Sequence, residues 1–171
     1  MSSSPYHYTV GPGTGSQRPT LQRSRSIKSE EGLDLQGPLE IAGSIKSGGS
    51  IKFDGDFAVK DKIDAYGAIN INGSLNSDGR IKAYGNIDVN GRLVARDKIK
   101  GYGKLRVVGS LEGTELEIYG NLSINGHLRC RRLVVYGSLT LIGAESSYQV
   151  DESEEVAGAK LRRDQEADWD W

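Results

Sequence analysis

The chain of 171 residues has one cysteine, one methionine, two histidines and two tryptophans. A single cysteine excludes an internal disulfide, and two histidines leave little material for a metal site. No segment approaches the roughly 18 apolar residues of a transmembrane helix, and the polar start is unlike a signal peptide. We therefore expect a cytoplasmic protein with no bound metal or cofactor.

The chain also has almost no excess of positive or negative charge. The formal net charge is −1, which removes the simplest argument for nucleic-acid binding. The charge is uneven, with +2 on residues 1–32, +3 on residues 33–143 and −6 on residues 144–171. The first segment is rich in Ser, Pro, Gly and Thr. We expect disordered tails at residues 1–32 and 144–171 around one folded domain at residues 33–143.

Glycine, by contrast, is abundant at 23 residues while proline stays at four, and the glycines follow a repeat of six residues. Steps of six from Leu33, with one residue dropped near Gly113 and another near Arg131, fall on Leu, Ile or Phe nineteen times out of nineteen. A second apolar residue comes two positions later, and glycine follows two further on in fifteen units. Alternating apolar residues indicate a short strand with one buried side, and the glycine indicates a corner.

Three such units make a longer period, which the Tyr-Gly dipeptide marks directly. Its tyrosines are spaced 18, 18, 17 and 17 residues apart: Tyr66, Tyr84, Tyr102, Tyr119 and Tyr136. One strand and its corner cannot bury an apolar side alone, but three can close a triangle whose coils stack. The sequence predicts an all-β, single-domain triangular parallel β-helix of about six coils over residues 33–143.

The inner positions of the first and last predicted coils are apolar. An open strand edge beside an apolar interior must be capped or must stack on another chain. We expect end-to-end self-assembly through these coils, with capping by a tail as the alternative. The end-coil residues are Leu33, Leu35, Leu39 and Ile41 at one end and Leu133, Val135, Leu139 and Leu141 at the other.

The stretch from Gly37-Pro-Leu-Glu-Ile-Ala-Gly to Leu139-Thr-Leu-Ile-Gly143 resembles a bactofilin domain, and the resemblance covers about 111 of the 171 residues. Bactofilins are polymer-forming cytoskeletal proteins with short hexad strands, glycine corners and disordered tails. The resemblance implies a right-handed β-helix that polymerises through its end coils into non-polar filaments without nucleotide. The start of the chain lacks the short hydrophobic or basic segment that targets some members to membranes, so we do not expect membrane attachment.

Hexapeptide acyltransferases also build triangular β-helices, and they are the competing enzymatic interpretation. Their unit places a small residue directly after the aliphatic one, whereas this chain has charged residues there, such as Asp34 and Lys82. Acyl transfer also needs a general base, but His7 lies in a predicted tail and His127 follows a corner without an obvious partner. Cys130 is expected to be a small buried apolar residue. We therefore expect a protein that is not an enzyme.

The Tyr-Gly tyrosines occupy outward positions and should stack about 4.8 Å apart on one outer face. Such a ladder either stabilises neighbouring coils or binds a partner. A basic strip broken by Asp64, Glu115 and Glu117 runs beside it: Lys62, Arg80, Lys82, Lys98, Lys100 and Lys104. The alternative function is therefore a monomeric β-helix that presents this tyrosine and basic face to a partner, with nucleic acid not expected.

Two short motifs lie in the predicted tails. The chain ends in an acidic tryptophan motif, Asp168, Trp169, Asp170 and Trp171. We predict that this motif folds onto the tyrosine face of its own or a neighbouring protomer, or binds a basic, aromatic-lined groove of a client protein. The segment around Ser26 resembles a substrate of Arg-directed kinases, and a phosphate there would cancel local positive charge.

Overall fold

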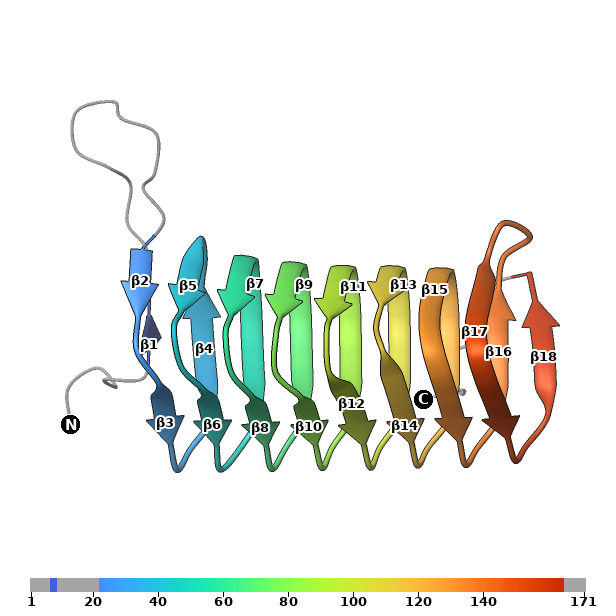
Figure 1. Ribbon diagram of the computed structural model, residues 1–171, viewed down its shortest axis with the longest axis horizontal. Helices are drawn as coiled ribbons and strands as arrows, with labels where there is room; N and C mark the ends of the chain where they lie inside the picture. The colour runs from blue at the N-terminus through green and yellow to red at the C-terminus, as the bar shows by residue number, and fades with distance from the viewer. Residues whose placement is uncertain (1–6, 9–21, 165–171) are drawn as a thin grey trace.

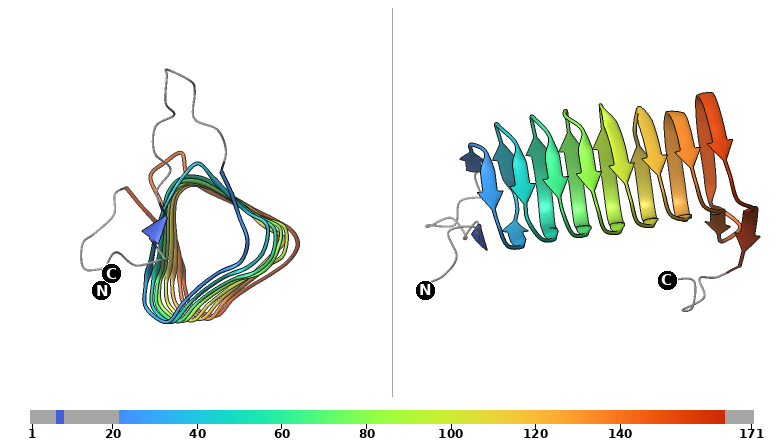
Figure 2. Two further views of the ribbon diagram at one scale, coloured as in Figure 1. Left: turned by 90° about the vertical axis from the view of Figure 1, so that its left-hand side faces the viewer. Right: turned by 90° about the horizontal axis from the view of Figure 1, so that it is seen from below.

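The computed structural model describes residues 7–8 and 22–164, which form a parallel β-solenoid (Figure 1). Its 18 strands belong to one sheet, and the coils stack into about eight turns. Seen along the rod, the coils superimpose in a three-sided outline (Figure 2). The predicted all-β parallel β-helix is thereby confirmed. The described residues contain no helix, and so none that could cross a membrane.

Each coil runs along three faces in the same order. Face 1 holds β2 (Gln22–Ser24), β5 (Leu39–Ile41), the second parts of β7 (Ile51–Val59), β9 (Ile69–Ser77), β11 (Ile87–Ala95) and β13 (Leu105–Glu112), the middle of β15 (Leu122–Val135) and the start of β17 (Ser147–Val156). Face 2 holds β3 (Ile27–Ser29), β6 (Ile45–Ser47), β8 (Ile63–Ala65), β10 (Ile81–Ala83), β12 (Lys98–Gly101), β14 (Glu115–Ile118) and the ends of β15 and β17. Face 3 holds β1 (His7–Tyr8), β4 (Leu33–Gln36), the first parts of β7, β9, β11, β13 and β15, then β16 (Leu139–Ile142) and β18 (Lys160–Arg163).

The core is a set of apolar columns that run the length of the rod. Side chains alternate inward and outward along each strand, and the inward ones are almost all buried. Phe53 and Phe57 meet edge to face with ring centroids 5.0 Å apart. In this coil and the one before it, one of the two inward positions of face 2 is small, Ala65 and Ser47, while the other is isoleucine. The large and small residues thus fill the interior together, as close packing requires.

Glycine is needed at two kinds of corner for two different reasons. Where face 3 passes into face 1, the glycines from Gly55 to Gly143 have positive φ, for example +136° at Gly91. At the corner between faces 2 and 3, Gly85 lacks positive φ, but an added Cβ would lie 2.9 Å from the backbone of Gly67 in the coil below. The sequence interpretation, which gave every glycine a turning role, therefore holds only for the first kind.

The solenoid extends beyond the predicted domain at both ends, so the boundary at residues 33–143 was wrong. Strands β2 and β3 add a coil before Leu33, and β17 and β18 add another after Gly143. The segments 22–32 and 144–164 thus do not belong to disordered tails. The prediction of about six coils was too low for the same reason. In the two added coils, most inward positions hold residues other than Leu and Ile, so the six-residue repeat did not reveal them.

Candidate functional site

The tyrosines of the Tyr-Gly repeat form one ladder along the corner between faces 2 and 3, the tyrosine corner. Tyr84, Tyr102, Tyr119 and Tyr136 are stacked in that order, with ring centroids 5.0, 4.9 and 4.7 Å apart and interplanar angles of 21° to 23°. Tyr66 lies edge-on to Tyr84 at 5.2 Å and 88°. The repeat spacing therefore produces a continuous ladder of five rings on the outside of the rod.

The tyrosine rings are exposed mainly at their edges. Their exposed fractions run from 38% at Tyr102 to 61% at Tyr66, and stacked neighbours cover one another's faces. In the coil before Tyr66 the tyrosine position is held by Gly48, and in the coil after Tyr136 it is held by Ala157. Neither residue has a side chain large enough to cover a ring. A planar ligand such as a nucleobase thus finds open ring faces only at the two ends of the ladder.

Two lysines bridge successive tyrosines. Lys82 Nζ lies 5.0 Å from the ring centroid of Tyr84 and 5.9 Å from that of Tyr102. Lys100 repeats the arrangement one coil further, at 5.3 Å from Tyr102 and 5.8 Å from Tyr119. A hydrogen bond with Tyr84 raises the pKa of Lys82. The two lysines thereby stabilise the ladder through cation–π contacts.

Two glutamates lie among the lysines of face 2, Glu115 at the start of β14 and Glu117 nearer the tyrosine corner. Lys98 Nζ lies 2.5 Å from Glu117 and 3.7 Å from Glu115, and Lys100 lies 4.0 Å from Glu117. Tyr119 donates a hydrogen bond to Glu117. Hydrogen bonds from Lys98 and Tyr119 lower the pKa of Glu117, and the hydrogen bond to Glu117 raises the pKa of Tyr119 to about 12. Glu117 therefore neutralises part of the predicted basic strip.

The remaining strip residues differ in how far they are paired. Arg80 lies 3.7 Å from Asp64. Lys62 is exposed and makes no ion pair within residues 7–8 and 22–164. Because Arg80, Lys98 and Lys100 all face carboxylates of neighbouring coils, half of the six cations in the strip are compensated, which weakens its attraction for a polyanion.

The last coil, residues 147–163, closes the C-terminal end of the core with polar side chains, and we call it the closing coil. By register, Glu154 follows Leu133 and Lys160 follows Leu139 in the inward columns. Glu154 accepts a hydrogen bond from Tyr148, 2.8 Å long, and forms an ion pair with Lys160. Partial burial opposes ionisation of Glu154, but the hydrogen bonds from Lys160 and Tyr148 outweigh it and lower its pKa. The interior thus ends in a hydrogen-bonded polar layer.

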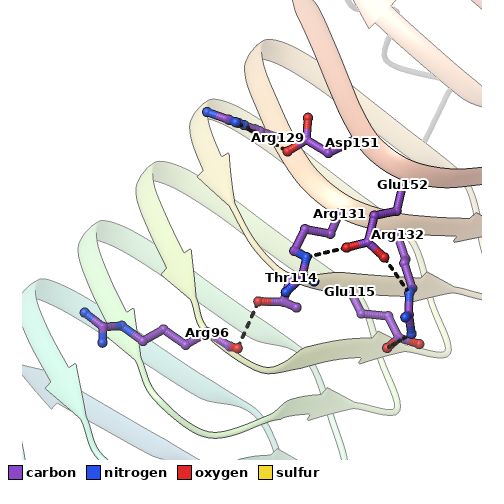
Figure 3. A network of polar contacts seen from close by, with 8 residues as sticks. All are labelled: Arg96, Thr114, Glu115, Arg129, Arg131, Arg132, Asp151 and Glu152. Atoms are coloured by element: carbon purple, nitrogen blue, oxygen red, sulfur yellow. Dashed lines mark hydrogen bonds and ion pairs between the residues drawn. The ribbon is translucent and has the colours of Figure 1, made fainter.

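Arginines of the preceding coil hold the closing coil at the corner between faces 1 and 2, the charged corner (Figure 3). Glu152 accepts hydrogen bonds from Arg131 at 2.6 Å and Arg132 at 3.3 Å. Arg129 lies 3.3 Å from Asp151. At the corner between faces 3 and 1, Arg162 donates a hydrogen bond to the Gly143 carbonyl at 2.7 Å and another to the Ser146 carbonyl at 3.1 Å. These contacts tie the polar layer to the rod.

The predicted C-terminal end-coil residues are therefore not at the end of the rod. Leu133, Val135 and Leu139 are at most 1% exposed, because the closing coil stacks on them. Leu141 is only half-buried, and Ile142 takes the inward place beside the corner at Gly143. The prediction that these four residues form the end was wrong, since polar residues of the closing coil take that role.

The N-terminal prediction was wrong in the same way. Leu33, Leu35, Leu39 and Ile41 are all buried, because β1 pairs with β4 and β2 pairs with β5. The first coil of the rod, residues 22–36 with β2, β3 and β4, is the leading coil; it contains Leu33 and Leu35 and precedes Leu39 and Ile41. Its inward residues on face 2 are Ile27 and Ser29.

Ser26 belongs to this leading coil rather than to a tail. Its side chain is exposed, and its Oγ accepts a hydrogen bond of 2.9 Å from the backbone N–H of Ser44. A phosphate on Ser26 would have to replace this contact between two coils. The kinase-substrate prediction thus stays untested, and it now concerns an ordered corner.

His127 has a partner that the sequence did not reveal. Its Nδ1 lies 2.9 Å from Ser147 Oγ of the closing coil, so the expectation of an unpartnered histidine was wrong. The two residues line an open depression of about 400 Å³ on face 1, together with Arg92, Glu112 and Arg129. Within the described part of the chain, no three His, Cys, Asp or Glu side chains could hold a metal ion together.

Cys130 lies in the core with 1% of its surface exposed, and burial raises the pKa of its thiol to about 12. It is thus protonated at neutral pH and poorly nucleophilic. The acidic tryptophan motif, Asp168 to Trp171, and the residues before Gln22 other than β1 lie outside the described residues.

Comparison with protein-family models, with curated proteins and with solved structures gave no match to this chain. The likeness to bactofilins consequently rests on the residues of the repeat, and the solenoid itself is the firmest guide to function. A rod of stacked coils fits a structural or scaffolding role.

Proposed function

We propose that this protein is a cytoplasmic structural scaffold whose rods assemble end to end into nucleotide-independent filaments. The observation that carries the proposal is the open backbone at both ends of the sheet. Strands β17 and β18 pair with only one neighbouring coil, and so do β2 and β3, within the described residues. Such edges are templates for pairing with another chain, and every other coil of the rod has both edges occupied. The proposal assigns no catalytic residue.

The closing coil defines what kind of contact the ends can make. Its inward Glu154 and Lys160 replace the bare apolar interior that would drive indiscriminate stacking. The C-terminal end is left with backbone hydrogen bonds, which are directional, and with charged side chains around them. Assembly should then be specific and should weaken at high salt. The resemblance of the repeat to bactofilins supports the same function and implies non-polar filaments.

Sedimentation velocity of the full chain over a range of concentrations and salt, without nucleotide or metal, tests the proposal. We expect species larger than one rod that grow with concentration and shrink as salt rises. A single species with the mass of one chain, 18.5 kDa, under all conditions would overturn the proposal.

A second candidate is a monomeric binding module that uses the tyrosine corner. The exposed ring edges and hydroxyls, with Lys82 and Lys100 beside them, suit an acidic polypeptide better than a nucleic acid, because the ring faces are occupied. Tyr102→Ala distinguishes the two functions. It should remove binding of an acidic client if the tyrosine corner is the site, and it should leave the sedimentation of the rods unchanged if the ends are.

A further inference from the structure

The closing coil keeps apolar side chains on the inner side of face 1. There Tyr148 follows Leu128, and Val150 follows Cys130, in the inward columns. Both side chains pack against the core, yet both are only partly buried, because within the described residues β17 pairs with β15 alone. The Tyr148 hydroxyl donates a hydrogen bond to Glu154, which fixes the ring. This end of face 1 therefore offers two apolar side chains beside a row of open backbone groups.

The chain that follows β18 starts beside this surface. The ladder between β16 and β18 places Arg163 next to Ile142, 21 residues earlier. It reaches the next corner, where the N–H of Gly143 donates to the Arg163 carbonyl at 2.7 Å. Asp164 thus takes the place that Gly143 has one coil before, at the corner between faces 3 and 1. Because face 1 follows this corner in every coil, the residues after Asp164 lead onto the open edge of β17.

Residues 165–171 lie outside the described residues, but their sequence has the pattern of a strand with one apolar side. Polar and apolar residues alternate without exception over residues 166–171, Glu-Ala-Asp-Trp-Asp-Trp. Strict alternation is typical of a strand that is buried on one side only. The two tryptophans make that side strongly apolar, so it needs an apolar surface to cover it.

The register of 21 residues, carried past Asp164, matches this pattern to the uncovered end of face 1. The facing positions are Trp169 and Tyr148, Trp171 and Val150, Asp168 and Ser147, and Asp170 and Gln149. Both tryptophans thus meet apolar inward residues, and both aspartates meet exposed outward ones. A slip of one residue would turn both aspartates toward the core. The sequence therefore favours the register that the β16–β18 ladder already sets.

We infer that residues 166–171 form a capping strand on the outer edge of β17, with Trp169 on Tyr148 and Trp171 on Val150 of the same chain. The surface is the apolar end of face 1, and its occupant is the chain's own acidic tryptophan motif. The tyrosine corner is a poorer site for that motif, because β18 starts beside this corner and runs away from it along face 3. The inference goes beyond the proposed function and does not depend on assembly, since the strand leaves the edges on faces 2 and 3 open.

Tryptophan fluorescence of the full chain tests the capping strand directly, because Trp169 and Trp171 are its only tryptophans. The measurement is made at concentrations where sedimentation shows single rods. An indole with one face against the coil below is open on about half of its surface, so acrylamide should quench it about twofold less than in a peptide of residues 164–171. Its emission should lie at shorter wavelength than that of the peptide. Equal quenching and emission in chain and peptide would overturn the inference.

Two lysine variants separate docking from attraction by charge. Val150→Lys and Gln149→Lys add the same charge to the same strand, but Val150 lies on its inner side and Gln149 on its exposed side. Val150→Lys should raise quenching to that of the peptide, whereas Gln149→Lys and Tyr102→Ala should leave it unchanged. Loss of protection in Tyr102→Ala but not in Val150→Lys would place the motif at the tyrosine corner and overturn the inference.

Disulfide cross-linking tests the register in a chain that keeps all the inward residues. Gln149→Cys/Asp170→Cys puts two outward thiols on facing positions of neighbouring strands, about 4.8 Å apart and within the range of about 4.4–6.8 Å between Cα atoms that a disulfide needs. Mild oxidation should close a disulfide within one chain, identified by mass spectrometry. The control Gln149→Cys/Asp168→Cys is two positions out of register and should stay reduced. The native thiol, Cys130, is buried.

The contrary results of the cross-linking experiment are equally specific. Disulfides that join separate chains would mean that the motif of a second copy occupies the edge, which overturns the capping strand as inferred. Equal closure of both cysteine pairs would mean that the motif has no fixed register on β17, and it overturns the inference as well. Neither result bears on the proposed end-to-end assembly, which sedimentation of the native chain tests separately.

Discussion

Glu154 and Lys160 form an ion pair on the inner side of the closing coil, in two columns that are apolar in every earlier described coil. The residues one coil before them are Leu133 and Leu139. Burial of a charged pair is favourable only where hydrogen bonds compensate it, and here Tyr148 supplies one while water reaches the open side. The pair therefore ends the apolar interior at this coil, which is what a terminal repeat of a solenoid requires.

Replacement of this pair by apolar residues should make the C-terminal end adhesive. We expect Glu154→Leu/Lys160→Leu to self-associate at lower concentration than the native chain, and to lose its salt dependence, because the apolar interior would then reach the open edge. Static light scattering across concentration and salt measures this. The control is Asn76→Leu/Glu112→Leu, which adds similar apolar surface to exposed positions in the middle of the rod. Equal association of the two variants would show that apolar residues at the end of the rod promote association no more than apolar residues in its middle.

The Tyr119–Glu117 hydrogen bond should be visible in an alkaline titration. The folded pKa of Tyr119, about 12, lies above the ordinary value of about 10. Its contribution to stability is thus fully present below pH 10 and is lost as the pH rises toward 12. Ultraviolet absorbance of phenolate should show a tyrosine that ionises near pH 12, and Glu117→Gln should lower the pH at which it ionises. An unchanged titration in the variant would show that this hydrogen bond does not raise the pKa of Tyr119.

Glycine at the corner between faces 3 and 1 should be irreplaceable wherever coils stack on both sides. An added Cβ at Gly91 would lie 2.0 Å from the Gly73 carbonyl oxygen, and its φ is +136°. We expect Gly91→Ala to lower the free energy of unfolding by at least about 3 kcal/mol. Gly143 also has positive φ, +90°, but an added Cβ there would lie no closer than 3.8 Å to a described neighbour, Ser146 Oγ. Gly143→Ala should accordingly cost about 1–2 kcal/mol.

Urea denaturation followed by circular dichroism compares the two alanine variants directly. Equal losses would mean that backbone conformation alone determines the cost. The close approach of stacked coils would then contribute nothing.

The tyrosine ladder should stabilise the rod by modest amounts. Tyr102 stacks on both Tyr84 and Tyr119, whereas Tyr66 contacts only Tyr84 and does so edge-on. A cross-strand pair is worth about 0.2–1 kcal/mol, so Tyr102→Ala should cost roughly twice as much as Tyr66→Ala in urea denaturation. A larger loss for Tyr66→Ala would contradict the ladder as a source of stability.

The sequence predicted the fold well because the inward columns are its most regular feature. A step of six that always falls on Leu, Ile or Phe, and a Tyr-Gly period of 18 or 17, specify both the strands and the number of faces. The leading coil was also detectable. Ser26-Ile-Lys-Ser29 recurs in full 18 residues later as Ser44-Ile-Lys-Ser47, and the structure pairs the two segments.

The closing coil could not be predicted from the same pattern. Its inward positions include Glu154 and Lys160, which a search for apolar columns rejects, and β15 and β17 shift register between Cys130 and Arg132. A charged residue in an inward position is acceptable only because the coil is terminal and a neighbour in space neutralises it. That neighbour is six residues away in the chain, and only the closed coil brings the two together.

Diffraction from oriented assemblies tests the central claim, end-to-end assembly, most directly. If the rods join through their terminal coils, strands run across the filament, and the spacing of about 4.8 Å between coils must appear along the filament axis. A repeat of roughly 38 Å, about eight coils at that spacing, should mark each copy. Filaments whose 4.8 Å spacing lies across the axis, or preparations that contain only separate rods, would contradict the account.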